Sequence, residues 1–341
     1  MQHKLNKGNL LDEDGNLCEA GYDFSLSKTY NRKDIKAHKL RIKEWDYYYI
    51  GNDEYGLAFT IADNSYMSLV SLSLLDFANK KEVTKSIMSF MSKGKLNLPS
   101  SSIDGDVSYK NKKVYFTFIN KNSKRHLSII YKGLHKKINF SCEIDLIEIN
   151  QNSMVIATPF DKKKHFYYNQ KVNCLKASGY FIYGNKKYNL KNNTYGVLDW
   201  GRGVWTYKNT WYWSSLNALD LDNNVIGFNL GYGFGNTKNA SENMVFFNKE
   251  AFKLEDVEFK IPYKKKNKED FMKDWKIESK DKKIDLSFHP LLDRFADSNV
   301  LFIRSLQHQV FGIFNGTIKV KGRTIKIENL LGFAEKVFNK W

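Results

Sequence analysis

Apolar and polar residues alternate with a period of two along much of this chain. The clearest case is segment 138–146, in which five apolar residues alternate with Asn139, Ser141, Glu143 and Asp145. Such alternation predicts a β-strand with one buried and one solvated face. Three pairs of similar segments are each separated by a polar turn. The pairs are 114–119 with 127–131, 275–277 with 284–288, and 318–320 with 325–327. These pairs predict three β-hairpins.

Strands at spacings of roughly ten residues are typical of antiparallel barrels or sandwiches. A doubly wound α/β fold is excluded, because it needs helices between the strands. Helical periodicity is found mainly at the C-terminus, where six apolar residues share one helical face. They are Leu330, Leu331, Ala334, Val337, Phe338 and Trp341. We therefore expect an all-β protein that ends in a short helix over 330–341.

The chain has 341 residues, which is long for a single hydrophobic core. The weakest patterning lies at 185–193, just before a segment rich in tryptophan. We therefore expect two β domains, the first over 1–188 and the second over 189–341.

The formal net charge of +17 suggests nucleic acid or an anionic membrane as a partner. Only seven of the 54 basic residues are arginine, the residue that nucleic-acid readers favour for its bidentate contacts. Nucleic acid is therefore not expected as a partner, whereas peripheral contact with an anionic membrane stays open.

The three cysteines, Cys18, Cys142 and Cys174, show no CxxC spacing, and the seven histidines form no HxH or HxxxH pair. Neither a metal site nor a cofactor is expected. The N-terminus lacks the apolar stretch of a signal peptide, and no window has the ~18 apolar residues of a membrane span. We expect a cytoplasmic protein.

Four of the seven tryptophans lie within 199–213, a segment that also contains Asp199 and Arg202. Tryptophan is large and its N–H needs a partner, so its concentration beside an acid and a base indicates a lined pocket. Gly201 and Gly203 permit backbone bends that could turn both charged side chains inward. A structural Asp–Arg pair at the end of a barrel is the alternative. Strand alternation would place Trp211 and Trp213 on one face.

A second motif, 227–236, has glycines in GxGxG spacing rather than the GxGxxG of dinucleotide-binding proteins. Glycine at every second strand position leaves one face bare, which suits a bulge, a close neighbour or a flat ligand. Asn229, Tyr232 and Glu242 are its polar candidates. His308 could be an acid or base near pH 7, or a structural histidine. We expect six residues to converge on one cavity: Asp199, Arg202, Trp205, Trp211, Tyr232 and Glu242.

The segments 198–205, 211–215, 227–233, 242–243 and 332–337, with Trp341, resemble the bacterial family named domain of unknown function 2804. The Lys43–Tyr48 segment is similar to the N-terminal signature of that family. The resemblance spans nearly the whole chain, but the family name records no activity.

A weaker resemblance concerns the order Asp199, Trp205 and then the Trp211-x-Trp213 strand before an Asp/Asn-rich turn. It is similar to the second half of carotenoid 1,2-hydratases and related lipocalin-like proteins. This resemblance implies two consecutive antiparallel lipocalin-like barrels and chemistry on carbon–carbon double bonds. Trp200-Gly201-Arg202 departs from the pattern of those proteins, in which a His-Glu-type pair follows the aspartate.

Two functions remain open. The first is an enzyme that protonates an apolar unsaturated ligand, such as a lipid, fatty acid or terpenoid, and so hydrates, isomerises or cyclises it. A carboxyl group among indole rings is desolvated and can stay protonated near neutral pH, which makes Asp199 the expected acid. The second is a lipid carrier without chemistry. The expected catalytic residues are Asp199, Arg202 and Glu242, and the expected ligand-binding residues are Trp200, Trp205, Trp211, Trp213, Asn229, Tyr232 and His308.

Overall fold

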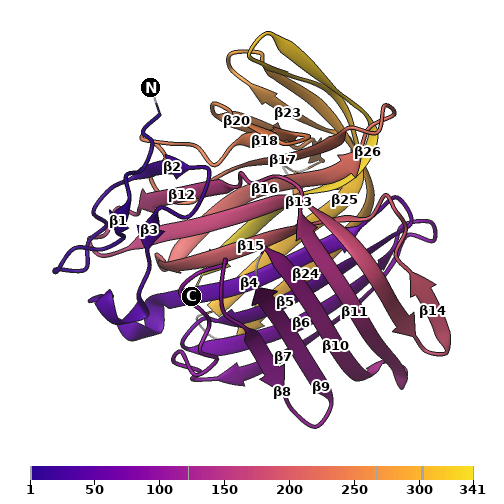
Figure 1. The fold of residues 1–341 in the computed structure, drawn as a ribbon, viewed down its shortest axis with the longest axis horizontal. Helices are drawn as coiled ribbons and strands as arrows, with labels where there is room; N and C mark the ends of the chain where they lie inside the picture. Colours follow the sequence, from indigo (N-terminus) through magenta and orange to yellow (C-terminus); the bar gives the residue numbers. More distant parts are fainter. Residues whose placement is uncertain (1, 122, 266–267, 301–302, 341) are drawn as a thin grey trace.

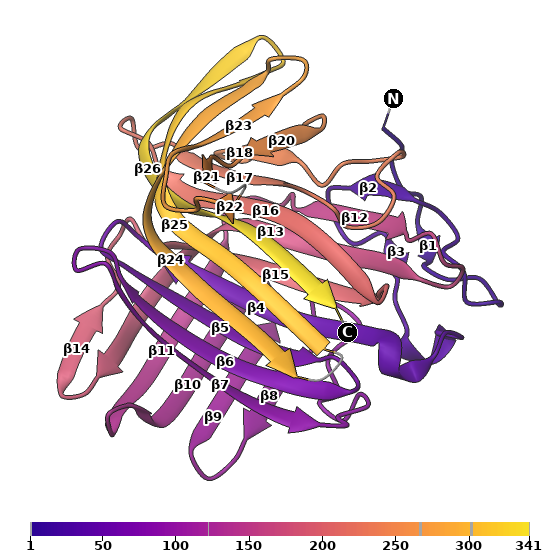
Figure 2. The ribbon, with the colours of Figure 1, turned by 180° about the vertical axis from the view of Figure 1, so that it is seen from behind.

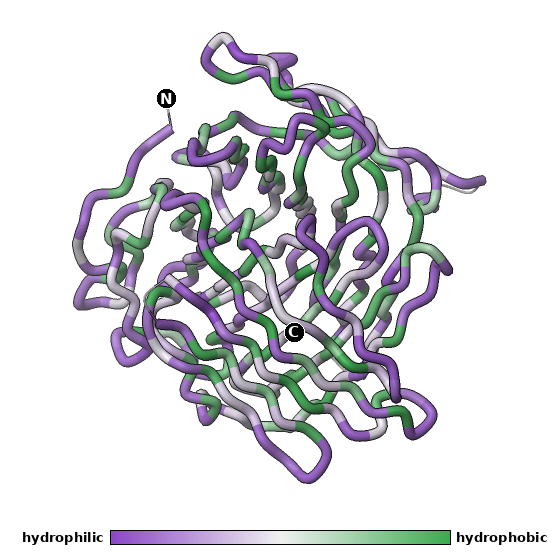
Figure 3. Tube along the Cα trace, turned by 45° about the vertical axis from the view of Figure 1, so that its right-hand side comes forward, coloured by the Kyte–Doolittle hydropathy of each residue, from purple (hydrophilic) through white to green (hydrophobic). Residues whose placement is uncertain are grey.

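The computed structural model describes residues 2–121, 123–265, 268–300 and 303–340. Two large antiparallel sheets, both curled, contain most of the chain (Figures 1 and 2). In Figure 3 hydrophobic and hydrophilic residues alternate along the strands, as expected for sheets with two different faces.

The first sheet has thirteen strands. Its main order is β7 (Lys81–Phe90), β6 (Met67–Asp76), β5 (Tyr55–Asp63), β4 (Ile42–Gly51), β15 (Tyr195–Val204), β13 (Phe166–Tyr183), β11 (Ile138–Glu148), β10 (Lys124–His135), β9 (Val114–Lys121) and β8 (Val107–Lys110). Strands β12 (Met154–Pro159) and β14 (Lys186–Asn189) also pair with β13, and β2 (Gly21–Asp23) pairs with β12.

The second sheet has nine strands. Its order is β19 (Glu250–Lys253), β18 (Met244–Phe247), β17 (Val225–Tyr232), β16 (Lys208–Leu219), β26 (Arg323–Lys340), β25 (Ile303–Val320), β24 (Ile284–Val300), β23 (Trp275–Ser279) and β20 (Val257–Lys260). The small elements are the pairs β1 (Gly8–Asn9) with β3 (Lys28–Thr29) and β21 (Tyr263–Lys264) with β22 (Lys268–Glu269), and the 3-10 turns η1 (Arg32–Asp34) and η2 (Lys39–Arg41).

This architecture confirms the predicted all-β fold of two consecutive antiparallel barrels, each of which is present as a curled sheet. The three predicted hairpins are present as β9–β10, β23–β24 and β25–β26. The prediction of a C-terminal helix is wrong, because 330–340 belongs to strand β26. Strands β16 and β25 flank this segment, and Gly332–Glu335 is buried on both faces. Burial on both faces removes the period-two signal and leaves an apolar spacing that matches a helix.

The change from one sheet to the other falls between Val204 and Lys208. Strand β15, which includes Asp199, Trp200 and Arg202, therefore belongs to the first sheet. The division into domains 1–188 and 189–341 stays a prediction, since sheet membership alone does not define folding units.

The described residues form three hydrophobic clusters. One fills the curl of the first sheet and another fills the curl of the second. The third combines residues of both sheets, among them Tyr47 and Tyr167 from the first and Trp213 and Phe333 from the second. The two sheets therefore pack against each other through an aromatic layer.

Arg202 lies on the face of β15 that points into the curl of the first sheet, and its side chain is fully buried. Its guanidinium forms an ion pair with Asp46 at 3.0 Å and donates to the backbone oxygens of Trp45, Gly201 and Pro99. Pro99 belongs to the connection between β7 and β8. Arg202 therefore holds this connection against the first sheet.

Arg202→Met should lower the free energy of unfolding by about 3–5 kcal/mol, because it leaves the carboxylate of Asp46 buried without its charge partner. Urea denaturation measures this change. Arg304→Met is the matched control, since Arg304 forms an exposed ion pair with Asp297 that solvent screens. Equal effects of the two substitutions would contradict a structural role for Arg202.

Candidate active site between the sheets

Strand β15 presents Asp199 to the aromatic layer between the sheets. Val197 belongs to the same layer, whereas Leu198 and Trp200 belong to the core of the first sheet. Gly201 and Gly203 do not bend the chain as expected: β15 runs unbroken through both of them. A Cβ on Gly201 would lie 2.0 Å from the ring of Trp45, so this glycine makes room for an indole.

Asp199 is paired with a buried lysine from the neighbouring strand β13. Nζ of Lys171 lies 3.1 Å from Oδ1 of Asp199, and the Lys171 side chain is 1% exposed. Nδ2 of Asn169 donates to the same carboxylate at 2.6 Å. Lys171 also lies over the ring of Trp213, at 3.8 Å from the centroid. An ion pair, a hydrogen bond and a cation–π contact together offset the cost of burying these charges.

Glu242 is a second buried carboxyl group in this layer, and it is only 1% exposed. Neither of its carboxyl oxygens has a hydrogen-bond partner among the described residues. A Cβ on Gly231 would lie 2.6 Å from Oε1 of Glu242, so the glycine-rich strand β17 leaves space for this carboxyl group. The bare face of the glycine motif therefore accommodates a close protein neighbour.

Hydrogen bonds fix the backbone around Glu242. Nδ2 of Asn229 donates to the carbonyl of Glu242 at 2.7 Å, and Oδ1 of Asn229 accepts from the indole N–H of Trp213 at 2.6 Å. The ammonium of Lys253 donates to Oγ of Ser241 and to the backbone oxygen of Asn243 on either side of Glu242. The position of Glu242 is therefore set independently of its carboxyl group.

A third carboxyl group, Glu335 on β26, connects the layer to the second sheet. It accepts the indole N–H of Trp211 at 3.0 Å and the side-chain amide of Gln309 at 2.9 Å. Oε1 of Gln309 in turn accepts from the hydroxyl of Tyr47 at 3.3 Å. These bonds join residues from both sheets into one polar network.

Aromatic rings enclose this network. Trp205 packs edge-on against Trp45, Tyr167 and Trp211, with centroid distances of 5.7, 5.6 and 5.3 Å. Phe234 stacks on Tyr167 at 4.9 Å. Trp45 and Trp211 are only partly buried, so the aromatic group is accessible at these two rings. We call the whole arrangement of carboxyl groups, Lys171 and aromatic rings the intersheet site.

The environment of Glu242 favours the protonated carboxyl group. Burial raises its pKa to about 8, and the nearby charge of Asp199 acts in the same direction, while Lys171 opposes the shift. Burial also raises the pKa of Glu335. Glu242 is therefore largely neutral at pH 7 and can donate a proton.

The intersheet site contains six of the ten residues expected from the sequence: Asp199, Trp205, Trp211, Trp213, Asn229 and Glu242. Trp211 and Trp213 share a face, as predicted. Whether these six residues bind a ligand or take part in catalysis stays a prediction.

The other four lie elsewhere. Of the six residues expected to converge on one cavity, Arg202 and Tyr232 do not lie in the intersheet site, so that expectation is wrong for these two residues. Trp200 and Arg202 face the curl of the first sheet. Tyr232 stacks on Tyr212 and packs against Phe259 in the core of the second sheet. His308 lines a different cavity, on the concave face of the second sheet. Successive side chains of a strand point to opposite faces. Each of these four residues follows or precedes a residue that faces the intersheet site, so its own side chain points away from that site.

The sequence reasoning missed several members of the intersheet site: Lys171, Asn169, Tyr167, Tyr47, Gln309 and Glu335. One signal was available. Segment 169–173 places four polar residues in a run that is flanked by apolar and aromatic residues, and such residues in a buried strand need specific partners.

A family model described as Domain of unknown function (DUF2804) matches residues 2–341. The chain belongs to the DUF2804 family. No curated protein matched this DUF2804 chain. Among the described residues, no three His, Cys, Asp or Glu side chains group as metal ligands, and no helix has the length and apolar content needed to cross a bilayer.

Two solved structures share the fold of this DUF2804 protein. Kievitone hydratase from Nectria haematococca aligns with a TM-score of 0.54 and 13% identity over 92% of this chain and 96% of its own. A provisionally assigned AttH protein from Nitrosomonas europaea aligns with a TM-score of 0.53 and 11% identity over 92% and 98% of the two chains. These likenesses confirm the resemblance to the lipocalin-like hydratase group at the level of the fold.

The protonation of Glu242 predicts a pH dependence of stability. The pKa of Glu242 is about 8 in the folded protein, against an ordinary value of 4.5 for a glutamate, so the folded state holds an extra proton between these pH values. The stabilisation is fully present below pH 4.5 and is lost as the pH rises towards 8. Compared with the wild type, Glu242→Gln should therefore gain stability between about pH 5 and pH 8, on the order of a few kcal/mol.

Urea denaturation of both proteins across this pH range measures the difference. Glu250→Gln is the control, because Glu250 forms an exposed ion pair with Arg323. A difference between wild type and Glu242→Gln that does not change with pH would show that Glu242 is already ionised in the folded protein.

Proposed function

We propose that the intersheet site binds an apolar or amphipathic unsaturated small molecule and catalyses acid-assisted hydration or isomerisation of a carbon–carbon double bond. The observation that carries this proposal is Glu242, a buried carboxyl group without a hydrogen-bond partner among the described residues, in a site enclosed by aromatic rings. Burying a carboxyl group without a hydrogen bond lowers the stability of the folded protein, so a purely structural role does not explain Glu242. A general acid needs such a position.

In the first step, the protonated Glu242 donates its proton to one alkene carbon. The π electrons form the new C–H bond, the O–H bond of Glu242 breaks, and the other alkene carbon becomes cationic. The face of a nearby aromatic ring, such as Trp211, would stabilise this carbocation. The glutamate carboxylate that remains balances its charge.

In the second step of hydration, the oxygen of a water molecule attacks the carbocation, and Asp199 accepts a proton from that water. Asp199 suits the role of base, because it forms an ion pair with Lys171. Return of the proton from Asp199 to Glu242 restores the starting state. Loss of a proton from a carbon next to the cation would instead give an isomerised alkene.

Here the roles differ from the sequence-based expectation, which made Asp199 the acid and gave Arg202 a part in catalysis. Glu242 is the better acid because its pKa is raised to about 8. Arg202 has no role in this scheme, since its side chain points to the opposite face of β15, where it forms hydrogen bonds and the ion pair with Asp46. The fold shared with kievitone hydratase supports hydration as the reaction class, without indicating the substrate.

The test is incubation of the protein with a panel of unsaturated fatty acids, terpenoids and isoflavonoids in water labelled with heavy oxygen and deuterium. Hydration adds the mass of one labelled water, and isomerisation introduces deuterium without oxygen. Mass spectrometry of the recovered compounds distinguishes the two. A lipid that co-purifies with the protein, detected by native mass spectrometry, should be added to the panel.

Glu242→Gln should lower turnover by about 10²–10⁴-fold, because the amide keeps the shape but cannot donate an acidic proton. Glu250→Gln should retain full activity. If Glu242→Gln is as active as the wild type, the acid role is wrong. If the wild type binds compounds of the panel and returns all of them unaltered, the protein is a carrier.

A further inference from the structure

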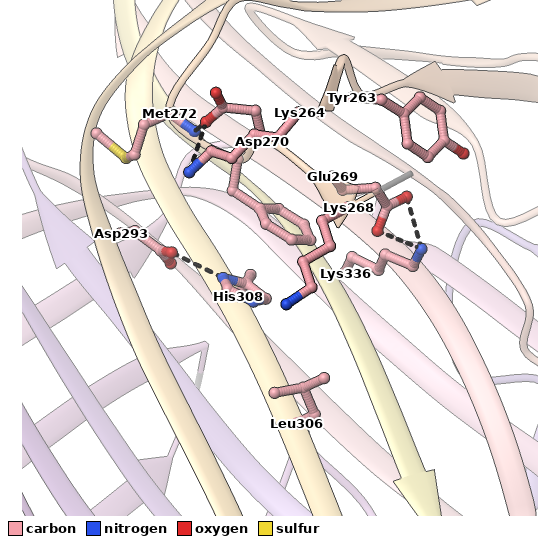
Figure 4. A pocket seen from close by; sticks show the side chains of 11 residues that line it. Tyr263, Lys264, Lys268, Glu269, Asp270, Met272, Asp293, Leu306, His308 and Lys336 are labelled. Atoms are coloured by element: carbon pink, nitrogen blue, oxygen red, sulfur yellow. Dashed lines mark hydrogen bonds and ion pairs between the residues drawn. The ribbon is translucent and has the colours of Figure 1, made fainter. Parts of the chain in front are cut away.

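A cavity of about 610 Å³ lies on the concave face of the second sheet, and Figure 4 shows the side chains that line it. Strands β25 and β26 separate this cavity from the intersheet site. Gln309 and Glu335 face the intersheet site, whereas their neighbours His308 and Lys336 line the cavity. The volume is in the range of sites for small organic molecules.

His308 is held rigidly at the edge of this cavity. Its Nδ1 lies 2.7 Å from Oδ2 of Asp293, and its ring stacks on Phe271 with a centroid distance of 3.7 Å and an interplanar angle of 7°. The ring of Phe295 lies 4.7 Å from the same imidazole. Two aromatic rings and a carboxylate therefore fix the imidazole, and Nε2 is left for another partner among the contacts described.

The charges that line the cavity are paired, with one exception. Lys264 lies 3.4 Å from Asp270, and the ammonium of Lys336 lies 2.7 Å from both carboxyl oxygens of Glu269. Lys268 has no acidic partner within ion-pair distance in the part of the chain that the structure describes. In Figure 4 its ammonium extends across the cavity towards His308. One cationic group is therefore available for an anion.

Apolar side chains complete the lining. Phe271, Met272 and Leu306 contribute rings and aliphatic groups next to the cations. We propose that this cavity is a second binding site, which takes an amphipathic organic monoanion such as a carboxylate or sulfonate with an aromatic or aliphatic body. The anionic group contacts Lys268 beside the imidazole edge of His308. The apolar body packs on Phe271 and Leu306.

The test uses two fluorescent probes of the same shape, anilinonaphthalene sulfonate and the uncharged phenyl naphthylamine. Lys268→Met should weaken binding of the sulfonate about tenfold, as expected for loss of a charge-assisted contact, and leave binding of the uncharged probe unchanged. Lys265→Met is the matched control, because Lys265 lies on the same hairpin connection but does not line the cavity. It should change neither affinity.

Leu306→Trp should weaken binding of both probes, because the larger side chain fills the cavity. Equal weakening of sulfonate binding by Lys268→Met and Lys265→Met would overturn the proposal, because it would indicate general surface charge. Unchanged binding of both probes to Leu306→Trp would also overturn it, because the probes would then bind elsewhere.

Discussion

The ion pair between Lys171 and Asp199 is the interaction on which the arrangement between the sheets depends. Both side chains lie where two aromatic-covered sheets meet, and neither charge could stay there alone, since burying an unpaired charge is very costly. The pair is supported by Asn169 and by the face of Trp213. Glu242 lies beside a set of charges that is already paired, and it is therefore favoured in its neutral form.

The strict alternation of side chains in strands gives the molecule three separate environments. Asp199 faces the layer between the sheets, and Arg202 faces the curl of the first sheet. Gln309 and His308 are separated in the same way on β25. Residues that are neighbours in the sequence thus serve different parts of the protein, and residues more than a hundred positions apart, such as Tyr47 and Gln309, share one network.

Much of the fold could be predicted from the sequence, because most strands bury one face and expose the other. The segment 138–146 shows this pattern and forms part of β11. The prediction fails at 330–340, where a strand buried on both faces has no such alternation. The tryptophan-rich segment contributes Trp205, Trp211 and Trp213 to the aromatic layer between the sheets. It could not show that Asp199 and Arg202 point in opposite directions, since that depends on an unbroken strand through two glycines.

Lys171 was missed for a different reason. The chain is rich in lysine, so a lysine in a strand does not by itself indicate a functional residue. The burial of Lys171 follows from the pairing of β13 with β15, which places it opposite Asp199. Glu335 was missed because its segment was interpreted as a helix. Contacts between distant strands, which set the protonation of Glu242, cannot be read from spacing along the chain.

The most direct test of the account is the protonation state of Glu242 itself. Infrared spectra of the wild type minus Glu242→Gln, recorded across the pH range, isolate the carboxyl band of this one side chain. The account predicts a protonated carboxyl band at pH 7 that is replaced by carboxylate bands near pH 8. A carboxylate band that is already complete at pH 6 would contradict it.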